Sequence, residues 1–287
     1  MNQLMQARNP KHNRVLCVHD LSSIGRCSLS TAMTVLSGVG IEPIVLPTAL
    51  YSMHTGFEGY SVCDTAIYMN DTLDSWQSLG LQLDCIYSGF LKGMRQIDTL
   101  VRAIREYKCL NIIDPACADN GQLYDGYDMQ FVHYFADTLL PLADILLPNI
   151  TEAMLLTGTP YQAPPYNRQF VVDLALKLLD RGARQLAITG VHLQDDTFGV
   201  LVVNGSSLNL VVQEYMQGHF SGAGDLWASI FVCAILYCDM LAASEIACTN
   251  TLQAIINTQD ANWGINCYSI MDNLRLEIDR ANKYSTI

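Results

Sequence analysis

The sequence predicts a three-layer α/β/α fold built around a central, mainly parallel β-sheet. Short apolar runs alternate with longer segments of helical periodicity along the whole chain, which is typical of such sheets. Half of the 287 residues are hydrophobic and only 15% are charged, so the chain can bury a large core. No repeat or low-complexity linker interrupts the pattern, which indicates one domain over residues 1–287 with a short polar extension at about residues 1–13.

Each expected element follows from its own local pattern. Short apolar runs predict strands, and apolar residues at i, i+3, i+4 and i+7 predict helices. Asn204–Gly205 is a turn dipeptide that predicts a hairpin between its two flanking strands. The expected strands are Arg14–His19, Glu42–Leu46, Cys85–Ser88, Leu110–Ile113, Ile145–Leu147, Leu186–Thr189, Phe198–Val203 and Leu208–Val212. The expected helices are Leu29–Leu36, Cys63–Leu79, Ile97–Tyr107, Phe131–Leu140, Thr151–Leu156, Val171–Leu179, Gly224–Tyr237, Ala242–Thr258 and Ile270–Lys283.

Composition argues against several classes of protein. The chain has 28 acidic and 16 basic residues, and the net charge of −12 disfavours nucleic acid as a partner. Its ten cysteines include no C-x-x-C pair, so we expect reduced thiols rather than a metal site or a disulfide framework. The N-terminus lacks the apolar region of a signal peptide, and the longest apolar stretch, Ile230–Tyr237, is too short to cross a membrane. These features predict a cytoplasmic protein without a membrane partner.

The most informative segment is Gln217–Trp227, which ends in a glycine-rich turn before an apolar helix. Gly222, Ala223 and Gly224 can bring backbone N–H groups together at the helix N-terminus, where an anion binds readily. Asp225 follows in the same turn, and its carboxylate can accept the proton of an attacking hydroxyl. This combination suits phosphoryl transfer. The alternative is an ordinary capped helix in which Asp225 only favours the N-terminal end.

Further polar residues follow other predicted strands, at the edge where ligands of parallel sheets bind. Asp114 and Asp119 follow one strand and could hold Mg²⁺, although the same residues also favour a plain turn. Asn149 and Glu152 begin a helix, where they could order a metal-bound water or simply cap the helix. Thr189–Gly190 ends another strand and by itself predicts only a turn.

The N-terminal half offers the side chains of a second binding site. Asp20 follows the first strand, Tyr51 and His54 follow the second, and Phe90 follows the third. Together they would suit a flat pyridine ring with polar substituents, through stacking and a few hydrogen bonds. The alternative is that the aromatic residues belong to the core and that His54 is structural.

Ser221–Leu226 resembles the G-[TA]-G-D signature of the ribokinase-like superfamily. This resemblance implies a ribokinase-like fold, with Asp225 as the catalytic base and Gly222, Ala223 and Gly224 as the anion hole. It also implies ATP as co-substrate. The positions that it assigns to nucleotide binding are Asp114, Asn149, Thr189, Gly190, Gly222 and Gly224.

Several motifs are similar to those of pyridoxal and pyridoxamine kinases, particularly the branch of Gram-positive bacteria. Asp114–Asp119 resembles D-P-V-x-G-D, residues 149–152 resemble N-x-x-E, His54–Gly56 resembles N-H-T-G, and residues 88–90 resemble T-G-Y. The resemblance implies phosphorylation of the 5′-hydroxyl of pyridoxal, pyridoxamine or pyridoxine by a homodimer, and it leaves activation by K⁺ open. It implies Mg²⁺ near Asp114, Asp119 and Glu152, and substrate contacts at Asp20, Tyr51, His54, Thr55 and Phe90.

The sequence departs from pyridoxal kinases at two positions, so substrates other than B6 vitamers remain alternatives. Asp20 stands where many pyridoxal kinases have Ser, and Met53 stands where they have Asn. An Asp at this place resembles the hydroxymethylpyrimidine kinases of thiamine synthesis, which usually carry Gln–Asn where this chain has Met53–His54. A non-catalytic ligand-binding protein of the same fold is a further alternative, although it would need no base at Asp225. A dinucleotide-dependent oxidoreductase is disfavoured because no G-x-G-x-x-G follows the first strand.

Overall fold

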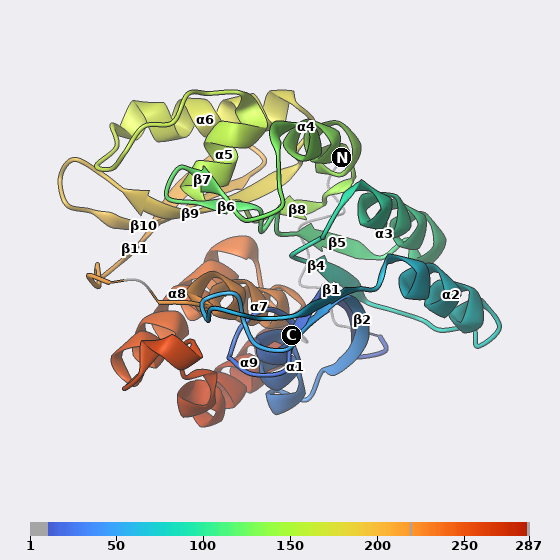
Figure 1. Cartoon of the computed structure of the whole chain (residues 1–287). Helices are drawn as coiled ribbons and strands as arrows, with labels where there is room; N and C mark the ends of the chain where they lie inside the picture. Colours follow the sequence, from blue (N-terminus) through green and yellow to red (C-terminus); the bar gives the residue numbers. More distant parts are fainter. Residues whose placement is uncertain (1–10, 219, 286–287) are drawn as a thin grey trace.

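The computed structural model describes residues 11–218 and 220–285 and confirms the predicted three-layer α/β/α fold (Figure 1). Its central sheet has nine strands in the order β11-β10-β9-β8-β5-β4-β1-β2-β3. The strands, including the two of a small separate ribbon, are β1 Arg14–Ser22, β2 Glu42–Tyr51, β3 Val62–Asp64, β4 Cys85–Ser88, β5 Leu110–Ile113, β6 Ala118–Asp119, β7 Gln122–Leu123, β8 Ile145–Leu146, β9 Gln185–His192, β10 Phe198–Asn204 and β11 Ser207–Gln213.

The helices alternate with the strands, as the sequence predicts. The α-helices are α1 Ser28–Gly38, α2 Ala66–Gln77, α3 Met94–Tyr107, α4 Met129–Thr138, α5 Ile150–Thr157, α6 Arg168–Asp180, α7 Ala223–Ile235, α8 Met240–Ile256 and α9 Met271–Ser285. Three 3-10 helices complete the described chain, at Leu140–Leu142, Ala261–Trp263 and Cys267–Ile270. Among the described residues, no helix combines the length and apolar character needed to cross a membrane.

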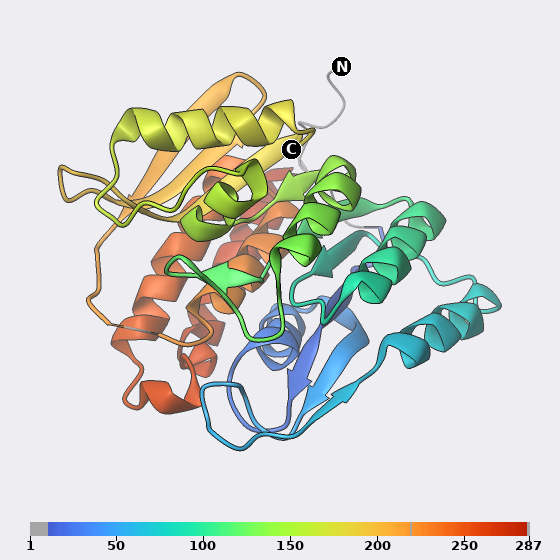
Figure 2. The same cartoon turned by 45° about the horizontal axis from the view of Figure 1, so that its top comes forward.

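The six central strands, from β9 to β2, run parallel, and the strands at both edges are antiparallel. The predicted hairpin is present as β10 and β11, with Asn204 paired to Ser207. Because the parallel strands point the same way, the loops at their carboxyl ends gather along one side of the molecule. Figure 2 shows the loop after β2, the β6–β7 ribbon and the loop between α8 and α9 on this side.

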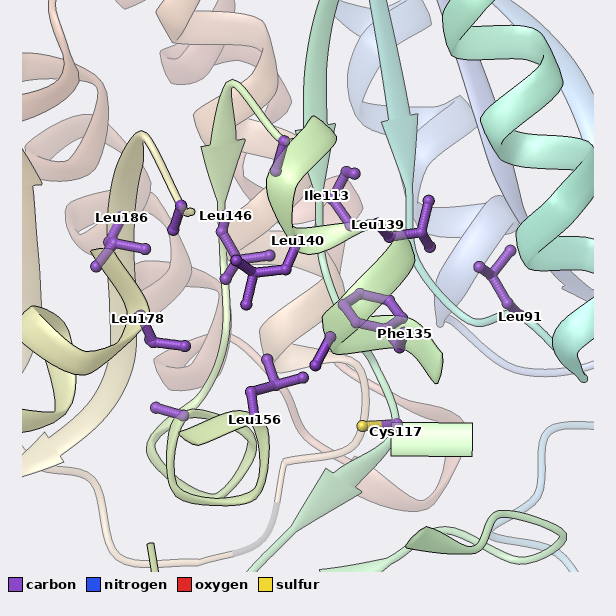
Figure 3. Packing of buried hydrophobic residues seen from close by; sticks show 14 of the residues in the cluster. Leu91, Ile113, Cys117, Phe135, Leu139, Leu140, Leu146, Leu156, Leu178 and Leu186 are labelled. Atoms are coloured by element: carbon purple, nitrogen blue, oxygen red, sulfur yellow. The ribbon is translucent and has the colours of Figure 1, made fainter. Parts of the chain in front are cut away.

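Two hydrophobic cores lie on opposite faces of the sheet. Successive residues of a strand point to opposite faces, so Leu16 and Val18 of β1 enter one core and Val15 and Cys17 enter the other. The first core packs under α2 to α6, and Figure 3 shows its leucines and Phe135 between helices and strands. The second core packs under α1, α7, α8 and α9. All ten cysteines are free thiols, as expected.

The expected helix Cys63–Leu79 is wrong at its N-terminal end. Residues Val62–Asp64 form β3, which pairs antiparallel with Ala49–Tyr51 at the sheet edge, and α2 begins at Ala66. The helical periodicity of the following residues conceals this short strand in the sequence. All three of its residues are exposed.

Three strands run further than their apolar runs indicate. β1 continues to Ser22 because Leu21 and Ser22 pair with Leu50 and Tyr51 beyond a bulge. Asp20 and Tyr51 therefore lie within strands rather than after them. β9 extends to His192 because β10 pairs with it, so the expectation that Thr189–Gly190 ends the strand is wrong.

The polar extension at the N-terminus is described from residue 11 onward. The backbone N–H groups of Lys11 and His12 donate to the Asp84 carboxylate, at 2.8 Å and 3.1 Å respectively. The expected extension of about residues 1–13 thus lies mostly outside the described residues, and its last part is attached to the start of β4.

Candidate active site

The glycine turn forms the N-terminus of α7, at the carboxyl side of the sheet. Gly222 caps the helix without a side-chain hydrogen bond. The N–H of Ala223 donates to the carbonyl of Phe220 at 3.1 Å, and the N–H of Leu226 donates to the carbonyl of Gly222 at 2.9 Å. The N–H groups of Gly224 and Asp225 lie between these two and have no acceptor within the helix. The turn therefore offers backbone donors to an anion, with the positive end of the helix dipole behind them.

Gly222 is required by this geometry for two reasons. Its φ of +81° lies in the left-handed region, which side chains rarely adopt. A Cβ atom at this position would also stand only 2.4 Å from the carbonyl oxygen of Arg26. The anion-binding turn is thus packed directly against the loop between β1 and α1.

Asp225 occupies the first turn of α7. Burial raises the pKa of its carboxyl group to about 6, the backbone of Ser28 opposes this shift, and the charge of Asp20 adds to it. At neutral pH the group is therefore mostly ionised, with a pKa close enough to the working pH for efficient proton acceptance. Its position beside the anion-binding turn is the one that a base for an attacking hydroxyl needs.

Asp20 and Ser28 lie next to this base. Asp20 is only 7% exposed, and burial raises the pKa of its carboxyl group while a hydrogen bond from the Ser28 hydroxyl lowers it. Ser28 therefore faces both carboxyl groups, through its hydroxyl and its backbone. Its φ of +43° is unusual for a residue other than glycine, which shows that the surrounding loop holds it in place.

Tyr51 and Phe90 come together, as expected for a binding site. Their ring centroids are 6.2 Å apart in an edge-to-face arrangement. Tyr60 packs on Tyr51 at 5.5 Å, and Tyr127 packs on Phe90 at 5.4 Å. The ammonium group of Lys92 lies 5.9 Å from the Tyr51 ring centroid. The result is an aromatic wall at the ends of β2 and β4 that suits a flat, polar ring.

His54 connects two loops through both ring nitrogens. Its Nδ1 accepts a hydrogen bond from the N–H of Gly56 at 3.0 Å, so the proton lies on Nε2, which donates to the carbonyl of Asn262 at 2.8 Å. Both nitrogens have protein partners, so the ring holds the loop after β2 against the loop after α8. Thr55, the next residue, is exposed in the same turn.

Asp114 directly follows β5, and Asp119 is the last residue of β6. Asp114 accepts a hydrogen bond from the N–H of Ala116 at 3.1 Å, and burial together with the charges of Glu152 and Asp225 raises the pKa of its carboxyl group. Asp119 is half-buried, and its two carboxylate oxygens accept from the backbone and side chain of Asn120. Asp114 therefore lies within electrostatic reach of both Glu152 and Asp225.

Glu152 forms hydrogen bonds with the backbone of the loop between these two aspartates. One carboxylate oxygen accepts from the N–H groups of Cys117 and Ala118 at 2.8 and 3.3 Å, and the other accepts from the N–H of Asn149 at 2.9 Å. Asn149 caps α5 through the N–H of Glu152, and its amide donates to the carbonyl of Ala118 at 2.7 Å. Burial raises the pKa of Glu152 to about 7, against the effect of these three N–H groups. The capping interpretation of Asn149 is therefore correct, and the Glu152 carboxylate holds the backbone of Cys117 and Ala118 in place.

Thr189 and Gly190 lie beside Asn149. The N–H of Thr189 donates to the carbonyl of Pro148 at 3.0 Å, and Asn149 forms a parallel bridge with Thr189. Gly190 has a φ of +71°, which suits glycine. The three residues that the resemblance assigns to nucleotide binding are therefore neighbours in space, although they lie 40 positions apart in the sequence.

A magnesium ion fits the donor chemistry of this edge. Asp114 is partly buried, and the nearby charges of Glu152 and Asp225 raise the pKa of its carboxyl group, so a cation bound at Asp114 would relieve this repulsion. Across the described ranges, no group of three acidic, histidine or cysteine side chains could form a complete metal site. Proteins usually bind Mg²⁺ with one or two carboxylates plus water and substrate phosphates.

Sequence reasoning missed the residues that support the site from the loop between β1 and α1. Arg26, Cys27 and Ser28 carry no motif, although they directly precede a predicted helix. The charges of Asp225 and Asp20, after burial, are the main causes that raise the pKa of the Cys27 thiol. Only the fold brings this loop next to the glycine turn, about 200 positions later in the chain.

Comparisons with known proteins show which family of proteins the chain matches. Residues 36–268 match the family described as phosphomethylpyrimidine kinase. A protein of Bacteroides thetaiotaomicron, provisionally assigned as a phosphomethylpyrimidine kinase, is 31% identical over 92% of this chain and 94% of its own, with a TM-score of 0.87. A second crystal form of that protein contains pyridoxal and has a TM-score of 0.85 over 92% of this chain and 96% of its own.

Pyridoxal kinases are similar over most of the chain as well. The structure of the enzyme from Lactobacillus plantarum is 25% identical over 93% of this chain and 98% of its own, with a TM-score of 0.84. The pyridoxal kinase of Arabidopsis thaliana is 23% identical and covers 85% of this chain and 81% of its own.

Proposed function

Since the chain belongs to the phosphomethylpyrimidine kinase family, we propose that it transfers the γ-phosphoryl group of ATP to the 5′-hydroxyl of a B6 vitamer. The acceptor would be pyridoxal, pyridoxamine or pyridoxine. The observation that carries this proposal is the position of Asp225 in the anion-binding turn, with Asp20 and the aromatic wall beside it. The 31% identical protein that was crystallised with pyridoxal supports the choice of acceptor.

We assign each predicted residue a role in the transfer. Asp225 accepts the proton of the 5′-hydroxyl as its oxygen attacks the γ-phosphorus, and the N–H groups of Gly224 and Asp225 stabilise the transferring phosphoryl group. Ala223 and Gly222 shape the turn. The aromatic wall of Tyr51 and Phe90 would hold the pyridine ring, with Asp20 hydrogen-bonding to its substituents.

The nucleotide would lie over the other half of the sheet edge. Asn149, Thr189 and Gly190 would contact its phosphates from the ends of β8 and β9. Asp114 and Asp119 would hold Mg²⁺, which neutralises phosphate charge when bound, and Glu152 would position their loop. His54 and Thr55 would keep the loop after β2 over the acceptor.

A second candidate is phosphorylation of hydroxymethylpyrimidine, as in thiamine synthesis. The specific observation in its favour is Asp20, whose buried carboxyl group lies in the acceptor site. A carboxyl group there can pair with the amino group and ring nitrogen of an aminopyrimidine. The pyridoxal-containing relative and the pyridoxal kinase neighbours favour the B6 vitamers.

Several expectations stay predictions. These are a homodimer, a requirement for Mg²⁺, activation by K⁺ and a cytoplasmic location. Gel filtration with light scattering tests the first, and omission of each cation from the assay tests the next two.

The test of the proposed function is the release of ADP from ATP and Mg²⁺ with one acceptor at a time. The acceptors are pyridoxal, pyridoxamine, pyridoxine and hydroxymethylpyrimidine. We expect turnover with at least one B6 vitamer that exceeds the turnover with hydroxymethylpyrimidine. Turnover with hydroxymethylpyrimidine alone would move the protein to the second candidate, and no turnover with any of the four would exclude both.

A further inference from the structure

Arg26 connects the loop between β1 and α1 to the loop between α8 and α9. Its backbone N–H donates to the carbonyl of Trp263 at 2.9 Å. Its Nε donates to the carbonyls of Ile265 and Gly264 at 2.9 and 3.1 Å, and its Nη2 donates to Gly264 and, at 3.5 Å, to Asp260. One residue thus satisfies four carbonyl groups of a loop more than 230 positions away, and most of these hydrogen bonds are assisted by charge.

The carbonyl of Arg26 meets the anion-binding turn on its other side. Gly222 and Gly264 both have left-handed φ values, +81° and +84°. A Cβ atom on either one would stand within 2.4 or 2.5 Å of the Arg26 carbonyl oxygen. The N–H of Ile265 donates to the carbonyl of Ser221 at 3.0 Å, so the loop between α8 and α9 also contacts the anion-binding turn directly. Three segments of the chain therefore meet around the backbone of Arg26.

Each of these segments carries part of the proposed active site. The first continues into Ser28, which faces both Asp225 and Asp20. The second is the anion-binding turn itself. The third includes Asn262, whose carbonyl accepts a hydrogen bond from Nε2–H of His54 and so holds the loop after β2. A displacement of the first or the third segment would move Asp20, Ser28 and the loop after β2 relative to Asp225 and the anion-binding turn.

We propose that Arg26 is a positioning residue, which holds the loop between β1 and α1, the anion-binding turn and the loop between α8 and α9 in one fixed arrangement. The inference rests on the proposed function for its assay but not for its geometry. Arginine suits this task because its planar group of donors can reach several carbonyls at once, whereas the single ammonium of lysine cannot.

The site around Arg26 is open enough for a chemical test. A surface cavity of about 350 Å³ is lined by Arg26, Asn257, Gln259, Asp260, Trp263 and Asn266. Added guanidinium ion can therefore reach the space that a shortened side chain at position 26 would leave.

The experiment compares Arg26→Met, Arg26→Ala and Arg26→Lys with the wild type, using its best acceptor. Arg184→Met is the matched control, because the Arg184 side chain is about half exposed and pairs with Asp144 beside the amino end of β9, remote from the site. We expect Arg26→Met to lower kcat/KM by about 100-fold, since a misplacement near 1 Å can cost that much. Arg26→Lys should fall between Arg26→Met and the wild type, and guanidinium should restore part of the rate of Arg26→Ala.

A second readout keeps the inference separate from the choice of acceptor. Calorimetry of MgADP binding needs no acceptor, and it should show weaker binding for folded Arg26→Met than for Arg184→Met. If the wild type phosphorylates none of the acceptors, the proposed function fails while this comparison still decides the role of Arg26. Normal kcat/KM and normal ADP affinity in Arg26→Met, or a loss that guanidinium does not restore in Arg26→Ala, would overturn the inference. Should Arg26→Met fail to fold, Arg26→Lys takes its place in both measurements.

Discussion

At the scale of single residues, the electrostatics of Asp225 makes a prediction about pH. The base must be ionised to accept a proton, and its pKa is about 6 in the free protein. We therefore expect kcat/KM to fall as the pH drops below about 6, since kcat/KM reports groups of the free enzyme. The measurement is a pH profile with pyridoxine, whose own ionisation is corrected by a parallel titration.

Asp20 provides the internal control for this profile. Its charge raises the pKa of Asp225, so Asp20→Asn should move the acidic limb to lower pH even if the overall rate falls. A limb that stays in place in Asp20→Asn would assign the titration to another group.

His54 makes a prediction about stability at the same scale. His54→Leu removes two hydrogen bonds and leaves the N–H of Gly56 and the carbonyl of Asn262 without partners. At about 0.5–1.5 kcal/mol each, the loss should lower the free energy of unfolding by roughly 1–3 kcal/mol. Urea denaturation measures it, with His133→Leu on the exposed side of α4 as the control. Equal effects of the two substitutions would show that His54 does not hold the loops.

At the scale of elements, two glycines in the first turn of α7 have different roles, one in stability and one in ATP binding. Gly222→Ala forces a left-handed alanine against the Arg26 carbonyl, so we expect a cost of at least about 1–2 kcal/mol in stability. A methyl group on Gly224 meets no protein atom within 4 Å. Gly224→Ala should therefore keep or slightly increase stability, yet weaken ATP binding because the methyl group enters the anion site. Thermal unfolding and the KM for ATP measure the two effects, and normal ATP binding by Gly224→Ala would contradict the assignment of the turn.

The start of α5 gives the second prediction at this scale. Glu152→Gln replaces one of two acceptor oxygens by a donor, which must face a backbone N–H of Cys117, Ala118 or Asn149. We expect a loss of about 1.5–3 kcal/mol in the free energy of unfolding, as for hydrogen bonds to a charged group. Glu106→Gln in an exposed ion pair with Arg102 is the matched control and should change stability little. A loss of activity without a loss of stability would instead favour a direct role for Glu152 at the metal.

At the scale of the whole molecule, the order of the long elements was predictable from sequence because each of them is marked by a local pattern. The short strands β3, β6 and β7 were not, since their pairing depends on neighbouring segments rather than on a pattern of their own. The same limit applies to the site. Asp225 and the glycine turn can be identified from a sequence motif, whereas Arg26 and Ser28 gain their roles only from contacts with distant parts of the chain. The sequence likewise could not show that both nitrogens of His54 bind backbone groups.

The proposal that Asp225 is the base of a B6 vitamer kinase is tested most directly by measuring the formation of a vitamer 5′-phosphate from ATP, by the wild type and by Asp225→Asn. Asn is nearly the same size as Asp but cannot accept the hydroxyl proton. We expect 5′-phosphate from the wild type and a kcat lower by about 100-fold or more in Asp225→Asn, with ATP affinity largely kept. Near-normal turnover by Asp225→Asn, or no 5′-phosphate from the folded wild type with any B6 vitamer, would contradict it.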